Sequence, residues 1–400
     1  MIHIMKILSI ETSCDETSIS LFTATPTDIG TDFTVHATVT YSQIDIHQEF
    51  GGVFPKLAKR EHQINLVPIL LKVLGEKASL KNNSMNPNPE IETILERETE
   101  LIQPFLQHIT QINNPGIDAI CVTSGPGLEP ALWVGISFAK ALGLLWNIPV
   151  VPVNHMEGHI LSVLVPENNS DQGNSFSVQT ELFQFPALAL LISGGHTEIV
   201  LVKEIGNYEI IGKTRDDAVG EAFDKVARIL GLPYPGGPEV SKLALLADKN
   251  INTDIILPRP MLHTKDYDFS FSGLKTAVLY MTNEIKEKNS GAIPEDIKAR
   301  IAYEFQEAAT EVITKKTLSA MHDFGAQTLI VGGGVSANKR IKESLQQKIS
   351  EIISVDHIYF PSRELTGDNA LMIGLAGYYK IKSDPNVIYN NIQAEGNLKL

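Results

Sequence analysis

Two stretches of the chain share one pattern of hydrophobic and polar positions. Residues 6–22, KILSIETSCDETSISLF, are apolar on both sides of a short polar turn, and residues 187–203, ALALLISGGHTEIVLVK, repeat that plan about half a chain later. Each pattern predicts a strand, a turn of small residues and a second strand. Two such units predict a duplicated fold, although the residue identity between them is weak.

Further strands are predicted where short apolar runs occur at 119–125 (AICVTSG), 328–334 (TLIVGGG) and 357–362 (HIYFPS). They alternate with helical patterns, of which one covers about 295–321 and another begins at Ser336. This alternation predicts an α/β protein. A chain of 400 residues also exceeds what one hydrophobic core usually organises, so at least two domains or two halves of a duplicated fold are expected.

The clearest helix is predicted over residues 216–231, DDAVGEAFDKVARILG, where the apolar side chains recur at helical spacing. Asp216 or Asp217 stands at the expected N-cap, and Gly231 at the expected C-terminal stop. Asp224 falls on the polar side of this helix. From the pattern alone, it either hydrogen-bonds a ligand such as a ribose or faces water.

Several segments are predicted to lie at the surface of the protein. Residues 81–90 and 167–177 are rich in Asn, Ser, Pro and Gly, which predicts surface loops. The denser basic segments, 55–63 and 336–348, are interpreted as solvated helix faces when each is taken alone. A net charge of −14 argues against a protein that coats nucleic acid through bulk electrostatics, but it leaves room for a local basic patch.

Composition narrows the class of protein. A hydrophobic content of 43% and a charged content of 20% are ordinary for a globular protein, and no apolar run is long enough to span a bilayer. The first ten residues, MIHIMKILSI, lack a basic region and a cleavage site, so they predict a strand rather than a signal peptide. Only Cys14 and Cys121 occur, which excludes a disulfide framework and favours a reducing cytoplasm.

A histidine pair raises the possibility of a metal site. His155 and His159 are four residues apart, so on a helix both imidazoles can reach one cation. Glu157 would point about 200° away from His155, which excludes it as the base of a zinc protease. The spacing alone leaves a metal site and two unconnected surface histidines evenly balanced. Asp368 either caps the helix that follows it or completes a site of two histidines and one carboxylate.

Three glycine-rich turns favour a nucleotide. SGGHT (193–197) joins two predicted strands and offers backbone N–H groups to an anion, and VGGGVSANKRI (331–341) ends a strand and opens a helix, whose N-terminus favours an anion. In LPYPGGPEVSKLA (232–244), Gly236 and Gly237 are candidates for a pocket wall. Each turn alone is better explained as a tight turn, but three in one chain favour a nucleotide-binding site.

Taken together, these motifs resemble the tRNA N6-adenosine threonylcarbamoyltransferase (TsaD) family in its bacterial form, once described as O-sialoglycoprotein endopeptidase. The resemblance covers nearly the whole chain, and Leu191 stands where archaeal and eukaryotic relatives commonly carry a tyrosine. The motifs that carry it, in the order of the family, are SIETSCDETSISL (9–21), HQEFGGVFPKLAKREH (47–62), NHMEGH (154–159), SGGHT, residues 216–238, FSFSGLKTAV (269–278), GGGVSAN (332–338) and DNALMI (368–373).

The resemblance implies an actin-like ATPase (ASKHA) fold, with two duplicated α/β domains around a nucleotide cleft. We place one domain at residues 1–152 plus 369–400 and the other at 153–368. Extra sequence at 81–106 and 167–183 is predicted to form surface insertions. The resemblance also implies one divalent metal per subunit, Fe2+ or Zn2+, on His155, His159 and Asp368. The implied adenylate-binding residues are Leu191, Ile192, Ser193, Gly194, Gly195, Asp224, Gly237 and Asn338.

The implied activity transfers the threonylcarbamoyl group of threonylcarbamoyl-adenylate to N6 of adenosine 37 in tRNAs that read ANN codons, releasing AMP. The implied partners are a TsaB-type paralogue and a TsaE-type ATPase, in the cytoplasm and without a membrane. No Ser-His or Cys-His nucleophile is visible, so we predict direct transfer without a covalent enzyme intermediate. The alternative is an actin-like-fold ATPase or kinase without tRNA modification, which would hold magnesium through carboxylates and water rather than imidazoles. The three candidate metal ligands argue against a non-catalytic scaffold.

Overall fold

The computed structural model describes residues 4–75, 88–166, 175–179, 182–247, 255–351, 357–385 and 391–400. The chain forms two compact units. The first unit comprises Met1–His47, Val53–Leu182 and Gly367–Leu400, and the second comprises Gln48–Gly52 and Phe183–Thr366.

This division differs from the predicted domain boundaries after residues 152 and 368. The structure groups 153–182, together with Gly367 and Asp368, with the first unit. The reason is strand pairing, because β5 (Val150–Asn154) pairs with β4 (Ala119–Gly125), and β6 (Ser175–Gln179) pairs with β3 (Gly30–Ser42). Hydrogen bonds in a ladder therefore hold residues 153–154 and 175–179 in the first sheet.

The sheet of the first unit has the strand order β5-β4-β1-β2-β3-β6. Its first hairpin consists of β1 (Met5–Glu11) and β2 (Glu16–Pro26), which pair antiparallel as the pattern of residues 6–22 predicts. β1 also pairs parallel with β4, and β4 with β5.

The sheet of the second unit repeats this plan in the order β11-β10-β7-β8-β9. β7 pairs antiparallel with β8 and parallel with β10, as β1 does with β2 and β4. The repeated order confirms the α/β class and the actin-like fold of two duplicated halves. The strands are β7 (Ala187–Ile192), β8 (Thr197–Glu204), β9 (Asn207–Lys213), β10 (Thr328–Gly332) and β11 (Ile358–Tyr359).

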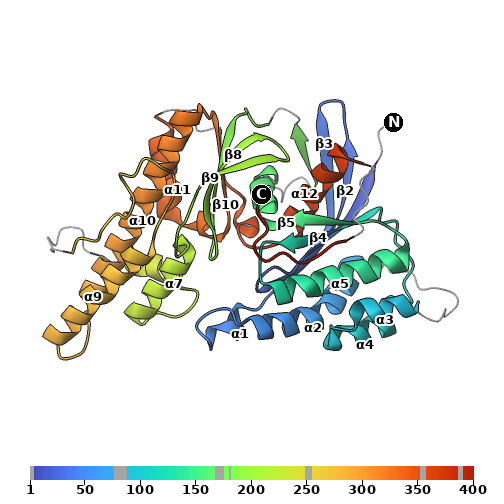
Figure 1. Ribbon diagram of the computed structural model, residues 1–400, viewed down its shortest axis with the longest axis horizontal. Helices are drawn as coiled ribbons and strands as arrows, with labels where there is room; N and C mark the ends of the chain where they lie inside the picture. The colour runs from blue at the N-terminus through green and yellow to red at the C-terminus, as the bar shows by residue number, and fades with distance from the viewer. Residues whose placement is uncertain are drawn as a thin grey trace. The chain divides into compact units, whose positions relative to one another are not determined.

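Helices cover both faces of the first sheet (Figure 1). Leu8 and Ile10 of β1 share a hydrophobic core with α2 and α5, whereas Ser9 points to the opposite face, beside Gly374 of α12. This alternation follows from the period of two along a strand. The helices of this unit are α1 (Ile44–Gln48), whose last residue already belongs to the second unit, α2 (Pro55–Leu74), α3 (Pro89–Leu95), α4 (Thr99–Pro104), α5 (Glu129–Trp146), α6 (His155–Leu161) and α12 (Ala370–Ser383).

Two glycines allow α12 to lie directly against the sheet. A Cβ added at Gly374 would lie 2.2 Å from a ring carbon of Phe22, and one at Gly377 would lie 2.2 Å from Sγ of Cys121. Any larger residue would push the helix away from the strands. The close packing brings the start of α12, and with it Asp368, to the first sheet.

The prediction of surface insertions is wrong for the described part of 81–106. Ile91 and Leu95 of α3 and Leu101 of α4 are fully buried and belong to the same core as α2 and α5. Residues 81–87 lie outside the described residues, as do 167–174, 180 and 181. Within the second segment, residues 175–179 form β6 at the edge of the sheet rather than a loop.

The helices of the second unit pack around Leu188, Leu190 and Ile192 of β7. A 3-10 turn of four residues lies at Gly334–Ala337, and one of three residues lies at Arg363–Leu365. The α-helices of this unit are α7 (Val219–Leu230), α8 (Gly236–Ala244), α9 (Ser272–Lys288), α10 (Glu295–Phe324) and α11 (Lys339–Ile349).

None of the described helices in the chain is long and apolar enough to cross a membrane.

Helix α7 confirms its predicted end but not its predicted cap. Gly231 follows the helix in a left-handed conformation with φ of 77°. The N-cap is Ala218, not Asp216 or Asp217. Asp216 instead accepts hydrogen bonds from the backbone N–H groups of Phe271 and Ser272, so a distant segment competes for the predicted cap.

Candidate metal centre and glycine turns

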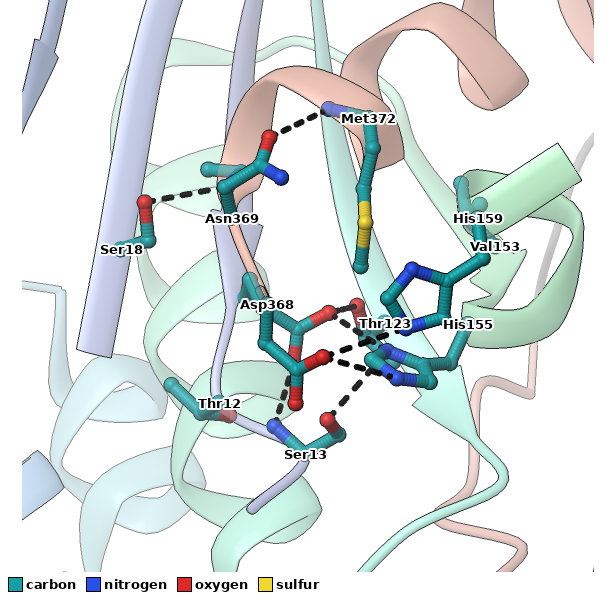
Figure 2. Close-up of polar contacts among 12 residues, drawn as sticks. Thr12, Ser13, Ser18, Thr123, Val153, His155, His159, Asp368, Asn369 and Met372 are labelled. Carbon is teal, nitrogen blue, oxygen red and sulfur yellow. Dashed lines mark hydrogen bonds and ion pairs between the residues drawn. The ribbon is translucent and has the colours of Figure 1, made fainter. Parts of the chain in front are cut away.

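The three predicted metal ligands lie together in the first unit (Figure 2). One ligand atom each from His155, His159 and Asp368 lies within 4.8 Å of the others. Nε2 of His155 is 3.4 Å from Oδ1 of Asp368, and Nε2 of His159 is 3.2 Å from the same oxygen. Both imidazoles are buried. The side chains are therefore placed so that they could hold one metal ion.

Helix caps place these ligands. Oδ1 of Asn154 accepts hydrogen bonds from the N–H groups of Met156 and Glu157, which starts α6 with His155 as its first residue. Oδ1 of Asn369 accepts one from the N–H of Met372 and so caps α12. The cap is therefore Asn369 rather than Asp368, and the carboxylate of Asp368 faces the histidines.

Glu11, at the end of β1, is a member of this site that the sequence did not reveal. Its carboxylate is fully buried, accepts hydrogen bonds from the N–H of Ser13 and from the Thr123 hydroxyl, and lies 3.1 Å from Nδ1 of His155. A histidine that donates Nδ1–H to a carboxylate has its ring orientation fixed and presents Nε2 to a cation. The available signal was an acidic residue at the end of an otherwise apolar strand.

The electrostatics of the cluster favour a positive charge. Burial acts to lower the pKa of His155, but the carboxylates of Asp368 and Glu11 outweigh it and raise that pKa well above its usual value. Burial acts to raise the pKa of Asp368, but the imidazoles of His155 and His159 hold it well below the usual range. The fully buried carboxylate of Glu11 and the partly buried carboxylate of Asp368 are thus balanced either by a proton on His155 or by a cation.

His159 provides a direct test of whether the site suits a metal. Its Nδ1 and Nε2 are both buried, and neither forms a hydrogen bond with any described residue. Nε2 faces Oδ1 of Asp368 at 3.2 Å, without hydrogen-bond geometry. Buried polar atoms are almost always satisfied, so a buried imidazole that has no hydrogen-bond partner and lies 3.2 Å from a carboxylate suits the role of a metal ligand. Two imidazoles and one carboxylate are ligands that suit zinc or iron.

Replacing Glu11 with glutamine should lower the affinity for Zn2+ or Co2+ by roughly tenfold or more, because the carboxylate that orients His155 is lost. Competition against a chromogenic chelator measures this affinity on the purified protein. The cobalt absorption spectrum should also change, because the ring of His155 is no longer held in one orientation. An unchanged affinity and spectrum would show that Glu11 does not support the site.

Glu157 lies away from this cluster, as the helical geometry predicts. It lines a separate polar pocket with Asn154 and Lys380, on another side of α6. The structure therefore gives Glu157 no part in the metal centre.

The predicted glycine turns gather in the second unit, near the carboxyl ends of its parallel strands β7 and β10. β7 and β10 are parallel neighbours, and Leu191 pairs with Gly332. The turns after Ile192 and Gly332 therefore begin side by side, at the carboxyl ends of the two strands. Gly333 has φ of 89°, and a Cβ added there would lie 2.4 Å from the carbonyl oxygen of Ile192. Carboxyl ends of parallel strands are the usual place for a ligand in α/β proteins.

The turn at Ser193 to Gly195 lies against the start of α7. The N–H of Gly220 donates to the carbonyl of Ser193, and a Cβ added at Gly220 would lie 2.5 Å from that oxygen. A Cβ at Gly194 or Gly195 would meet no neighbour, so this part of the turn is open. A helix N-terminus beside an open turn suits an anionic group.

Asp224 and Asn338 both form hydrogen bonds with α8, which begins with Gly236 and Gly237. Asp224 accepts a hydrogen bond of 2.7 Å from the N–H of Gly236 at the start of α8, and burial raises its pKa. Asn338 caps α11 and donates to the hydroxyl of Ser241 on α8 and to Gln306. Both side chains thus hold helix N-termini in place. The structure brings Leu191 to Gly195, Asp224, Gly237 and Asn338 into one network of neighbouring elements.

The model of the TsaD family, tRNA N6-adenosine threonylcarbamoyltransferase, matches residues 34–85 and 93–375. A protein of that name from Ralstonia pickettii is 38% identical over 381 residues, covering 95% of this chain and 93% of its own. Another, from Thermosipho africanus, is 40% identical over 400 residues, covering 99% of this chain and all of its own. Among solved structures, full-length HypF in a phosphate-bound and nucleotide-bound form has a TM-score of 0.49 at 12% identity, over 96% of this chain and 47% of its own. On the match to the family model and to these two relatives, the chain belongs to the tRNA N6-adenosine threonylcarbamoyltransferase family.

Proposed function

We propose that this protein transfers a threonylcarbamoyl group from threonylcarbamoyl-adenylate to N6 of adenosine 37 in tRNAs that read ANN codons, releasing AMP. The observation that carries the proposal is the grouping of His155, His159 and Asp368 in a chain of this family. An actin-like kinase that holds magnesium through carboxylates and water has no need of two buried imidazoles.

The adenylate portion would be held by the glycine turns of the second unit. Its phosphate carries a negative charge, which suits the open Ser193 to Gly195 turn and the N-termini of α7, α8 and α11. Asp224 would accept a hydrogen bond from a ribose hydroxyl, and Gly237 and Asn338 would complete the wall. These roles are supported by the network of neighbouring elements described above.

His155, His159 and Asp368 would hold one divalent metal ion, with Fe2+ and Zn2+ as the candidates that two imidazoles and a carboxylate suit. When bound, the ion would supply Lewis-acid polarisation of a phosphate or acyl oxygen. Glu11 would keep the His155 ring in place, and the buried surroundings of both histidines would keep water out of the cluster. The chain itself thus mainly binds and orients.

Transfer would be direct. The substrate is a mixed anhydride with AMP as a good leaving group. The N6 amine of adenosine would form a bond to the carbamoyl carbon, the bond from that carbon to the phosphate oxygen would break to release AMP, and the amine would lose one proton to the medium. Cys14 and Cys121 are poor candidates for a covalent intermediate, because burial raises the pKa of both thiols. For Cys121 the pKa is raised to about 12. Labelled substrate should therefore leave no acyl group on the protein.

The full activity would also involve a TsaB-type paralogue and a TsaE-type ATPase, in the cytoplasm.

The decisive experiment expresses this chain with those partners in cells that lack the endogenous enzyme. Mass spectrometry of digested tRNA should then show threonylcarbamoyladenosine. Its absence, with the protein folded and the partners present, would overturn the proposed function.

A further inference from the structure

Neither the metal centre nor the glycine turns account for the motif at residues 47–62, HQEFGGVFPKLAKREH. The structure buries its last residue, His62, although the surrounding basic segment predicted a solvated helix face. Nε2 of His62 lies 3.0 Å from the carbonyl oxygen of Cys14, in the turn between β1 and β2. A carbonyl oxygen can only accept, so Nε2 carries the hydrogen and donates it.

The other nitrogen of His62 is an acceptor. Burial lowers the pKa of His62 to about 4, so the ring is neutral near pH 7 and Nδ1 has no hydrogen. The Thr17 hydroxyl donates to Nδ1 at 2.7 Å, and the side-chain amide of Gln43 lies 3.4 Å from it. One tautomer therefore satisfies both ring nitrogens.

From Gln43 the chain of hydrogen bonds continues to His47. With its amide NH2 facing His62, Gln43 presents its oxygen to Nε2 of His47 at 3.1 Å, so that nitrogen donates. Nδ1 of His47 then accepts from the backbone N–H of Phe54 at 3.3 Å. Every hydrogen bond from Phe54 to Cys14 points in one direction, and a single set of proton positions serves all of them.

His62 is one of three groups that hold the turn before β2. The N–H of Leu128 donates to the carbonyl of Ser13 at 2.7 Å, and the N–H of Gln43 donates to that of Asp15 at 2.9 Å. The carbonyl of Cys14, between them, is held by His62. Three successive carbonyls are thus fixed from three different segments, and His62 is the only side chain among the three donors.

The turn supports the metal centre directly. The N–H of Ser13 donates to the carboxylate of Glu11, and the Ser13 hydroxyl lies 3.3 Å from Nδ1 of His155. A rotation of the peptide planes in this turn would therefore shift the Glu11 carboxylate and the Ser13 hydroxyl, the two groups at Nδ1 of His155.

We propose that His62 is a positioning residue for the metal centre, which acts by holding the turn at Ser13 and Cys14 against Glu11 and His155. The inference rests on the proposed metal site. It assigns a role at that site to a side chain that comes from α2 and is not itself a candidate ligand.

The experiment measures metal binding by three variants of the full chain. His62→Leu removes both hydrogen-bonding nitrogens, and His62→Gln restores a donor that can reach the Cys14 carbonyl. The matched control is Gln63→Leu, because Gln63 is equally a buried residue of α2 but bonds to Glu98 and to the N–H of Glu100, away from the turn. Affinity for Zn2+ comes from chelator competition, and the cobalt spectrum and thermal unfolding midpoint are recorded in parallel.

We expect His62→Leu to lower zinc affinity by roughly tenfold and to alter the cobalt spectrum, as loss of a supporting group does. His62→Gln should recover most of that affinity. Gln63→Leu should lower the unfolding midpoint but leave affinity and spectrum as in the wild type.

Two results would overturn the inference. Equal zinc affinities for wild type, His62→Leu and Gln63→Leu would show that His62 serves the fold alone, while leaving the metal site intact. A wild type that binds no zinc, cobalt or iron would remove the proposed metal site and this role with it. The two failures are distinguished by the wild-type measurement.

Discussion

Asp368→Asn should lower the affinity for Zn2+ by about two to three orders of magnitude, because breaking a buried ion cluster by removing one partner costs about 3–5 kcal/mol. Asparagine keeps the volume of the side chain but loses the charge that faces Nε2 of both His155 and His159. Threonylcarbamoyladenosine in tRNA from complemented cells should fall to background. Chelator competition and mass spectrometry of digested tRNA measure the two effects.

The matched control for this prediction is Glu157→Gln. Glu157 is an acidic residue on the same helix as both histidines, but it lines the polar pocket beside Lys380 instead of the metal centre. Zinc affinity should stay within about twofold of the wild type, since Glu157 is outside the ligand set and its charge faces the pocket of Lys380. Equal losses in the two variants would point to a general charge effect and contradict a ligand role for Asp368.

Gly333→Ala should destabilise the second unit by about 3 kcal/mol or more. The backbone at Gly333 has φ of 89°, and the new Cβ would lie 2.4 Å from the carbonyl oxygen of Ile192. A side chain in the left-handed region and a clash with backbone each cost about 1–3 kcal/mol. Because the turn must move, the affinity for adenylate ligands should fall as well.

Hydrogen exchange at the amides of β10 reports this loss, since both tryptophans, Trp133 and Trp146, belong to the first unit. Gly334→Ala is the matched control, because a Cβ at Gly334 meets no neighbour and its φ is not in the left-handed region. Its stability should stay within about 0.5 kcal/mol of the wild type, as for ordinary surface changes. Similar losses at 333 and 334 would contradict the geometric argument.

Local sequence patterns predict those features that depend only on residues close together in the sequence. The hydrophobic and polar pattern of residues 6–22 and 187–203 predicts both hairpins, because successive side chains of a strand point to opposite faces of the sheet. The spacing of His155 and His159 placed both rings on one face of α6 for the same reason. Gly231 ended α7 as predicted, since a left-handed C-cap is a local preference of glycine.

Local patterns did not predict the contacts between segments that are distant in sequence. Asp216 was predicted as a helix cap, but the N–H groups of Phe271 and Ser272 take its carboxylate. Residues of α3 and α4 were predicted as a surface insertion, yet Ile91 and Leu101 are fully buried. Whether an apolar side chain is covered depends on which helix packs on it, and no local pattern contains that information.

Local patterns along the chain are enough to predict the α/β class, the duplicated hairpins, the glycine turns and the position of two histidines on one helix face. Contacts in the folded chain place Asp368 against those histidines while Asn369 caps the helix. They also bring Glu11 of β1 to His155 and His62 of α2 to the turn at Cys14. The physical reason is the same in each case. Covalent spacing and backbone preference act over a few residues, whereas a buried polar group is satisfied by whichever segment the fold brings within about 3 Å.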